Sequence, residues 1–338
     1  MNANHVKIVR NAELADTHIH LEQYPPEDAA RMLREFRNEG GEFVVAVSMN
    51  LESARRTERL AQQYPGLVRP AYGFHPEQPL PNATEEEALF AWMEARTDGS
   101  AGTSPSMADT GADAALSAAD TGDAVSLSAA DTINAVSLST ADSGNAVFLP
   151  LVDSDAGAED DPPRMTAVGE VGLPYYSRLE AAERGETLDE AGYIRLLERF
   201  IAFAARHNLP IVLHAVYEDA DIACDLLERH GVTQAHFHWF KGSEATVQRM
   251  IANGFFISFT PDLLYEEEIR QLALLYPESL VMSETDGPWP FEGPFEGRST
   301  HPSMTAEVCR EWARLRGLDE SEARAQLLEN ARRFYDRN

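Results

Sequence analysis

The chain has 338 residues, of which 43% are hydrophobic and 25% are charged, a composition typical of a globular protein. Its formal net charge of −28 argues against broad, non-specific binding to nucleic acid, which needs lysine and arginine on the surface. No apolar run is long enough to cross a bilayer, and no signal peptide is apparent. We therefore expect a cytoplasmic monomer without a membrane partner. Cys224 and Cys309 are too few for a disulfide framework, and we expect both to be buried thiols.

Apolar segments alternate with amphipathic helical patterns along most of the chain. Strands are expected at residues 16–20, 43–48, 68–75, 165–172, 210–214, 234–239, 254–259 and 279–286. Helices are expected at residues 26–40, 51–65, 84–96, 193–208, 217–231, 243–254, 265–277, 304–315 and 319–335. Nearly continuous apolar strands between amphipathic helices indicate a parallel sheet that is covered on both faces. Eight of them fit a TIM-type (β/α)8 barrel, so residues 1–338 are predicted to form one α/β barrel domain.

One segment, residues 98–163, departs from this pattern and precedes the fourth strand. It contains no lysine or arginine and is rich in Ala, Ser, Asp, Thr and Gly. An 11-residue unit recurs in it, and its four near-copies begin at Ala108, Ala119, Ala130 and Ala141. Each copy offers too few apolar residues to bury a core of its own. We expect a low-complexity acidic insertion that is disordered, with a small β-solenoid as the alternative.

The first predicted strand ends in Asp16-Thr17-His18-Ile19-His20. Histidines at positions i and i+2 of a strand point to the same face, which in a barrel strand is the interior. Two imidazoles at the mouth of a barrel suit a divalent transition metal. This pair alone leaves open a second interpretation, in which His18 and His20 are hydrogen-bonded polar residues without a metal.

Four further strands also end in a residue that can bind a metal, namely Glu170, His214, His238 and Asp286. Active sites of TIM barrels form at the C-terminal ends of the strands, and a charged residue that closes a buried strand is costly unless it is paired or metal-bound. The combination therefore predicts a metal centre. His236 shares a strand face with His238, but it is expected to lie deeper in the barrel because His238 immediately precedes the loop.

Several motifs resemble those of the TatD family of metal-dependent hydrolases in order and spacing. They read DTHIHLEQY, YGFHPE, AVGEVGLPYY, IVLHA, HFHWFKGS and SETDGPW, and the terminal LLENARRFY is similar to the closing motif of that family. The resemblance covers essentially the whole chain except the insertion. It implies a TIM-type barrel with one or two divalent metals, for which Zn, Mn and Mg all remain possible.

The resemblance also implies a division of the ligands between two metals. His18, His20, Glu170 and Asp286 would hold the first metal. Glu170 would bridge to the second metal, which His214 and His238 would hold. Glu170 and Asp286 are the expected catalytic residues: Glu170 sets the metal–metal distance, and Asp286 accepts the proton of a metal-activated water as general base.

The family resemblance implies hydrolysis of phosphodiester bonds in DNA with exonuclease character. The expected substrate is therefore a nucleic-acid strand end or a small phosphodiester. The alternative is an ester or amide hydrolase, such as a D-aminoacyl-tRNA deacylase, and a barrel that binds without catalysis is a third possibility. The expected substrate-binding residues are His75, Lys241 and Trp239, while Trp289 and Phe291 are candidates for base stacking or for loop packing.

The sequence departs from the family pattern in residues that are expected to face the substrate. Pro174 replaces the aspartate of the GLDY motif, and Val216 replaces a basic residue that often follows the fifth-strand histidine. Trp239 stands where the family has a cysteine. These changes leave all six predicted ligands in place. Lys241 and Arg178 are the nearby cations that could replace the missing basic residue.

Overall fold

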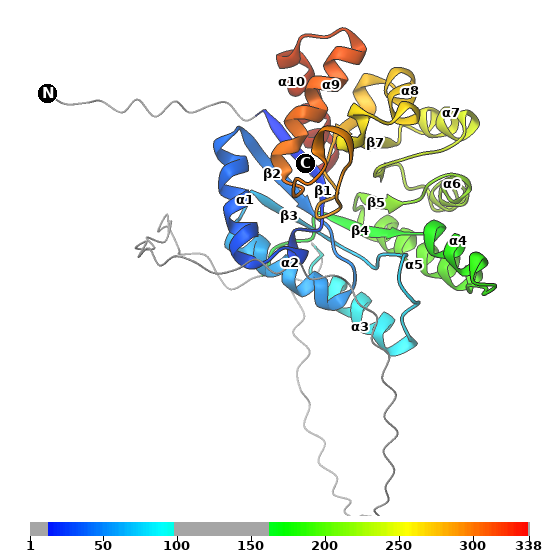
Figure 1. The fold of residues 1–338 in the computed structure, drawn as a ribbon. Helices are drawn as coiled ribbons and strands as arrows, with labels where there is room; N and C mark the ends of the chain where they lie inside the picture. The colour runs from blue at the N-terminus through cyan, green and yellow to red at the C-terminus, as the bar shows by residue number, and fades with distance from the viewer. Residues whose placement is uncertain (1–12, 98–161, 337–338) are drawn as a thin grey trace, which may run out of the picture. The chain divides into compact units, whose positions relative to one another are not determined.

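Residues 13–97 and 162–336 are described in a computed structural model of the protein. Eight parallel strands hydrogen-bond to one another in the order in which they occur along the chain, and helices surround them (Figure 1). The strands are β1 Leu14–Ile19, β2 Gly41–Ala46, β3 Val68–Tyr72, β4 Ala167–Gly172, β5 Ile211–His214, β6 Ala235–Phe237, β7 Phe256–Phe259 and β8 Val281–Ser283. The predicted (β/α)8 barrel is confirmed. The insertion predicted at 98–163 lies outside the described residues, apart from its last two positions.

Ten α-helices lie in the described part of the chain. They are α1 Pro26–Asn38, α2 Leu51–Gln63, α3 Ala83–Glu94, α4 Tyr175–Glu183, α5 Glu190–His207, α6 Glu218–His230, α7 Glu244–Ala252, α8 Glu267–Leu275, α9 Thr305–Arg316 and α10 Glu320–Tyr335. Short 3-10 helices occur at Leu21–Gln23, Pro261–Leu264, Glu278–Leu280, Gly293–Phe295 and Pro302–Met304. None of the helices in the described ranges is long and apolar enough to span a membrane.

The sequence patterns predicted every α-helix except α4. Helix α4 buries only Ala181, so it carries no apolar stripe that a periodic pattern could reveal. Other helices have clear end signals. Asn82 and Glu85 form a capping box at the start of α3, and Gly231 ends α6 in the left-handed conformation with a φ of 66°.

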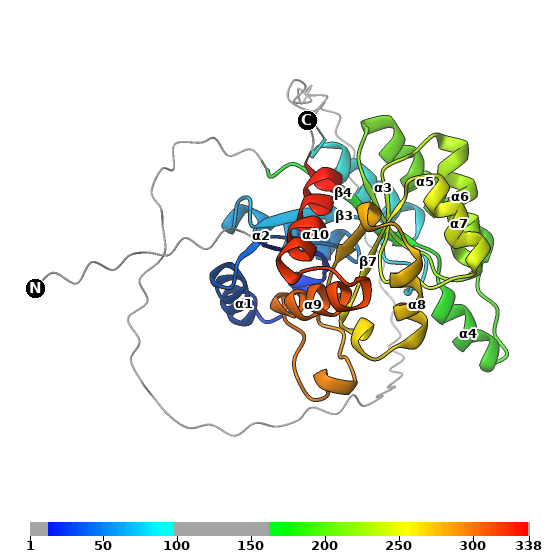
Figure 2. The same ribbon diagram turned by 90° about the horizontal axis from the view of Figure 1, so that it is seen from above.

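Two hydrophobic clusters lie on opposite faces of the strands. Phe43 and Val45 belong to an inner cluster, whereas Val44 and Ala46 belong to an outer cluster that the surrounding helices cover. Helix α10 supplies Phe334 to the inner cluster. The two C-terminal helices α9 and α10 lie side by side (Figure 2). Both predicted thiols are buried in the outer cluster, at Cys224 and Cys309.

Strands β1 and β8 close the barrel through side-chain and loop hydrogen bonds. The Thr17 hydroxyl donates to the carbonyl of Ser283 at 3.1 Å, and the Ser283 hydroxyl donates to the carbonyl of Ala15 at 3.1 Å. Just beyond β8, the backbone N–H of Asp286 donates to the carbonyl of His18 at 2.9 Å. The seam therefore brings the ends of the first and last strands together.

Register shifts interrupt β1 between Asp16 and Ile19 and β4 between Val168 and Val171. They change which residues face the interior. In β4, Ala167 belongs to the inner cluster and both Val168 and Val171 to the outer cluster, so strict alternation fails between them. Such irregularities redirect side chains next to functional sites. The one in β4 allows Glu170 to point into the barrel.

Candidate metal centre

The carboxylate of Glu170 lies at the centre of the six predicted ligands. Its Oε2 atom is 3.1 Å from Nε2 of His18 and 3.1 Å from Nε2 of His20. Its Oε1 atom is 3.0 Å from Nδ1 of His214 and 2.7 Å from Nε2 of His238. Each oxygen thus contacts one pair of histidines, and the rings of His18 and His238, one from each pair, stack with their centroids 3.8 Å apart.

Asp286 joins the pair on the Oε2 side. Its Oδ1 atom is 3.4 Å from Nε2 of His18 and 3.6 Å from Nε2 of His20. Asp286 has a positive φ of 49°, an uncommon conformation for a residue other than glycine. The structure therefore brings all six predicted ligands together and sorts them into a group of four with Asp286 and a group of three without it, which share Glu170.

The residues present fit a divalent metal. Glu170 and His18 are fully buried, and the partners of the Glu170 carboxylate are histidine nitrogens. The ligand atoms of His18, His20 and Glu170 lie within 4.8 Å of one another, as do those of His75, Glu170 and His214. Imidazole nitrogens and carboxylate oxygens at such short separations are the donor chemistry of zinc and related ions.

The pKa values of Asp286 and Glu170 are shifted by burial and by the neighbouring histidines. Burial raises the pKa of Asp286 to about 7, although His238 and His20 act in the opposite direction. Burial also raises the pKa of Glu170, but the surrounding histidines more than offset this and hold its pKa well below the usual value. Positive charge is therefore needed around Glu170, and bound cations can supply it.

His75 lies beside the centre. Its Nε2 atom is 3.4 Å from Oε1 of Glu170, and its ring centroid is 5.0 Å from that of His214. Burial lowers the pKa of His75 to about 3, so the ring is neutral near pH 7. The Nδ1 atom of His75 accepts a hydrogen bond from the backbone N–H of Glu77 at 3.1 Å, so in the neutral ring Nε2 carries the proton and faces Glu170 as a donor.

His236 lies away from the Glu170 carboxylate, at the depth that its position in β6 predicts. Its Nδ1 atom is 2.7 Å from the hydroxyl of Tyr335 on α10, and its Nε2 atom is 2.5 Å from the hydroxyl of Ser258 on β7. Both ring nitrogens therefore have partners within the barrel. His238, two residues further along the chain, is the histidine that reaches Glu170.

Asp16 stabilises the contact between the ends of β1 and β8. Its carboxylate accepts hydrogen bonds from the backbone N–H of Thr285 at 3.0 Å, from the Thr285 hydroxyl at 2.5 Å and from the backbone N–H of His18 at 3.3 Å. These contacts fix the backbone of His18. Asp16 therefore positions the end of β1.

Two acidic residues at the centre were not predicted. Glu284 is fully buried, and its Oε1 atom accepts a hydrogen bond from the backbone N–H of Trp239 at 2.7 Å and lies 3.8 Å from Nδ1 of His238. Simple alternation along β8 could have revealed it, because Met282 belongs to the inner cluster and Glu284 follows two positions later. The other, Glu77, lies in the loop after β3, where no periodicity applies.

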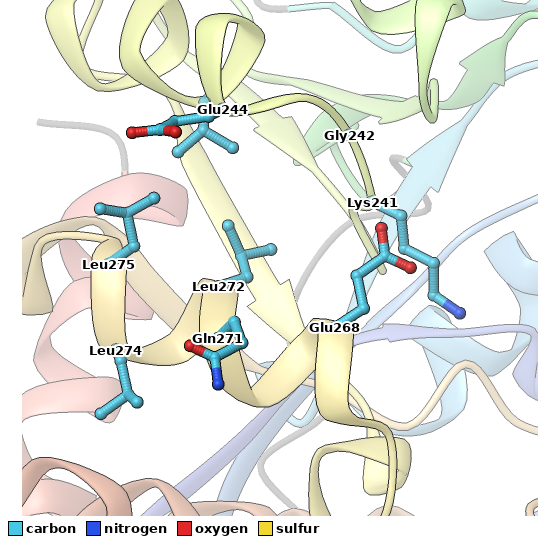
Figure 3. Close-up of a pocket in the computed structure, with 9 residues that line it drawn as sticks. Lys241, Gly242, Glu244, Glu268, Gln271, Leu272, Leu274 and Leu275 are labelled. Carbon is cyan, nitrogen blue, oxygen red and sulfur yellow. The ribbon is translucent and has the colours of Figure 1, made fainter.

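The two candidate cations have different surroundings. Arg178 on α4 is held by Asp219 at 2.8 Å and by Glu218 at 3.0 Å, so two carboxylates engage its charge. Lys241 lines a groove of about 570 Å³ between α7 and α8 (Figure 3). Its Nζ atom is 5.9 Å from the centre of the Trp239 ring.

This groove is separate from the six ligands, none of which lines it. Its lining residues are Lys241, Gly242, Glu244, Val247, Glu268, Gln271, Leu272, Leu274 and Leu275. Figure 3 shows Lys241 and Glu268 close together at one end, and Leu274 and Leu275 at the other. The groove therefore connects the loop after β6 with the outer surface of α8.

The predicted aromatic residues form one cluster. The Trp239 ring contacts Trp289 edge to face at 5.9 Å and lies 5.6 Å from Phe291. Phe291 is buried, whereas Trp289 is 57% exposed. Of these three, Trp289 is thus the side chain best placed to stack on a substrate, and Phe291 packs the loop. Tyr176 on α4 is 45% exposed, and its ring lies 6.1 Å from that of His214.

A barrel with histidines and carboxylates at one rim is typical of metal-dependent hydrolases, and comparison with known proteins identifies the family. The family model described as TatD related DNase matches residues 15–109 and 156–336. The chain belongs to this family.

Known relatives and structures agree with this assignment. The chain is 31% identical over 322 residues to an uncharacterized metal-dependent hydrolase of Haemophilus influenzae, a match that covers 95% of this chain and 99% of that protein. It is 30% identical over 185 residues to the 3'-5' ssDNA/RNA exonuclease TatD of Erwinia tasmaniensis, covering 52% of this chain and 67% of the relative. The crystal structure of YjjV, a TatD homolog from Escherichia coli, superposes with a TM-score of 0.67 at 21% identity and covers 97% and 99% of the two chains. This last likeness supports the barrel fold.

Proposed function

We propose that this protein is a metal-dependent hydrolase that cleaves phosphodiester bonds at the end of a DNA strand, with exonuclease character. The observation that carries the proposal is the position of Glu170, whose two oxygens face two separate groups of nitrogen ligands at 2.7–3.1 Å. A carboxylate in this position can bridge two divalent ions. When bound, these ions would activate a water for attack and stabilise the negative charge of the attacking and leaving oxygens.

The side chains divide the remaining work. His18, His20, Glu170 and Asp286 would hold one ion, and Glu170 would share the second ion with His214 and His238. Asp286 is the proposed general base, because its side chain is 12% exposed whereas that of Glu170 is fully buried. A carboxylate that reaches solvent can take a proton from water and release it again.

The proposed substrate contacts are His75, Lys241 and Trp239, to which the structure adds the exposed rings of Trp289 and Tyr176. An aromatic ring that stacks on a base contributes roughly 1–3 kcal/mol and tolerates any base. Exposed rings close to the proposed metal ligands suit an unpaired strand end better than a duplex. The relative named as an ssDNA/RNA exonuclease supports the same substrate class.

A second candidate keeps the centre and changes the bond that is cleaved. Because Arg178 is engaged by Asp219 and Glu218, and because Val216 is apolar, few cations remain near the mouth to contact phosphate. This favours an ester or amide hydrolase, such as a D-aminoacyl-tRNA deacylase, as the alternative.

An activity panel with added Zn²⁺, Mn²⁺ or Mg²⁺ separates the two candidates. We expect release of nucleotides from a 3′-labelled single strand, with Asp286→Asn inactive. Hydrolysis of carboxylic esters or aminoacyl-tRNA without release of nucleotides would replace the proposed activity with the alternative. A protein that binds metal and cleaves none of these substrates would contradict both and indicate a binding role.

A further inference from the structure

Glu77 contacts a proposed metal ligand from a loop that lies outside the set of six ligands. Its Oε1 atom is 3.3 Å from Nε2 of His214. The same carboxylate accepts hydrogen bonds from the backbone N–H of Tyr176 at 2.9 Å and of Ser177 at 2.7 Å. The Glu77 side chain is only 16% exposed, so these contacts are partly shielded from water.

The two backbone contacts compensate for a missing cap on α4. The first N–H groups of a helix have no partners within the helix. The N-cap position of α4 is Pro174, whose side chain makes no capping hydrogen bond. Glu77 supplies the acceptor from the loop after β3 and thereby fixes its own carboxylate against a rigid element. A side chain held in this way can orient a third group.

The two nitrogens of the His214 ring face different partners. Nδ1 is 3.0 Å from Oε1 of Glu170 and 3.2 Å from Nε2 of His238, so it faces the centre. Nε2 faces Glu77. When one nitrogen of a histidine binds a metal, the other usually donates its proton to a carboxylate, which fixes the ring and strengthens the ligand.

We propose that Glu77 is a positioning residue for His214: it accepts the Nε2 proton, leaves Nδ1 free as a ligand, and locks the ring to the first turn of α4. The inference rests on the proposed metal centre and concerns the second ion, the one held on the Oε1 side of Glu170. Glu77 would not itself touch that ion or the substrate.

The test measures the Zn²⁺ affinity of full-length protein from which metal has been removed. Zn²⁺ is titrated in a calorimeter and, separately, in competition with a chromophoric chelator. We compare the wild type with Glu77→Ala and Glu77→Gln. Glutamine keeps one oxygen acceptor for an α4 amide, replaces the other oxygen by an NH₂ group, and loses the negative charge that faces His214. Asp319→Ala is the matched control, because the Asp319 carboxylate also accepts two backbone N–H groups at a helix start, on α10, and contacts no predicted ligand.

We expect both Glu77 variants to bind one of the two Zn²⁺ ions roughly 10–100-fold less tightly than the wild type and the other ion with unchanged affinity. Their Co²⁺ forms should show a changed visible absorption spectrum. Glu77→Gln should unfold at a temperature closer to that of the wild type than Glu77→Ala does. Asp319→Ala should lower the unfolding temperature and leave Zn²⁺ affinity and the Co²⁺ spectrum unchanged.

Three outcomes would overturn the inference. Wild-type Zn²⁺ affinity in a folded Glu77→Gln variant would remove Glu77 from the centre while leaving the proposed function intact. An equal loss of affinity in Asp319→Ala would mean that capping stability alone is responsible. Absence of Zn²⁺ binding by the wild type would contradict the metal centre itself, and the inference with it.

Discussion

Glu170 is the side chain on which the proposed chemistry depends, because it contacts all four histidines of the ligand set. Replacing its carboxylate by an amide keeps the size of the side chain and removes the charge that two cations would share. The register shift in β4 that directs Glu170 inward belongs to the backbone, so the substitution should not disturb it.

We therefore expect Glu170→Gln to lose metal and turnover while it stays folded. Metal content measured by mass spectrometry should fall by at least one ion per chain, and the circular dichroism spectrum should match that of the wild type. Glu267→Gln is the control, because Glu267 lies 75% exposed at the start of α8. Full turnover of Glu170→Gln with excess metal would show that this carboxylate is dispensable.

His236 and His238 provide a second contrast, because His236 lies in β6 and His238 directly follows its end. His238 reaches Glu170, whereas His236 bonds to Tyr335 and Ser258. We expect His238→Ala to lose metal affinity. His236→Ala should keep metal affinity and lower the free energy of unfolding by about 1–3 kcal/mol, because it removes the buried partner of the Ser258 hydroxyl and one of the two partners of the Tyr335 hydroxyl.

Urea unfolding and metal titration of both variants test this contrast. Loss of metal from His236→Ala and retention of metal by His238→Ala would reverse the two assignments.

The position of His238 next to the loop was sufficient to predict which of the two lies nearer the mouth. Glu284 and Glu77 were not predicted, for different reasons. Glu284 lies two positions before the predicted residue Asp286, so strand alternation could have indicated it. Glu77 lies in the loop after β3, where no such pattern applies.

At the scale of elements, the strands were predictable because each is a buried apolar run. The ends of those runs supplied the six residues that the structure brings together around Glu170. Helix α4 was not predictable, since eight of its nine residues remain outside the core. The register shifts in β1 and β4 were also invisible, because they depend on how neighbouring strands pair.

The connection between α3 and β4 carries the repeat-rich segment, and the structure brings its two ends together. The backbone N–H of Met165 donates to the carbonyl of Arg96 at 3.1 Å. Arg96 follows the C-terminal end of a helix and Met165 precedes the N-terminal end of a strand, so these two residues lie at the opposite end of the barrel from the predicted ligands.

We expect that replacing residues 98–163 by a short Gly/Ser linker leaves turnover and metal content within about two-fold of the wild type, because insertions at surface connections are tolerated when core contacts persist. Steady-state kinetics and elemental analysis of the shortened chain measure both. Failure of the shortened chain to fold would show that the segment is part of the structural core.

At the scale of the whole molecule, the barrel and the metal centre should be thermodynamically coupled. The six proposed ligands come from five strands and the loops that follow them, so an ion that binds them only in the folded chain would stabilise the entire barrel. The strongly acidic chain, with a net charge of −28, should add long-range attraction for cations.

We expect EDTA to lower the midpoint of thermal unfolding and added Zn²⁺ or Mn²⁺ to restore it. At a free metal concentration of roughly 100 times Kd, the gain in unfolding free energy should be about 2.7 kcal/mol per site. Calorimetry measures the shift. Glu170→Gln should show little response to metal, and an equal response in that variant would indicate that metal stabilises the protein at some other site.

Anomalous diffraction from crystals grown with Zn²⁺ or Mn²⁺ tests the central claim most directly. The account predicts one peak among His18, His20, Glu170 and Asp286, and a second among Glu170, His214 and His238. Crystals in which the ions occupy other positions, or in which these side chains bind none at saturating metal, would contradict it.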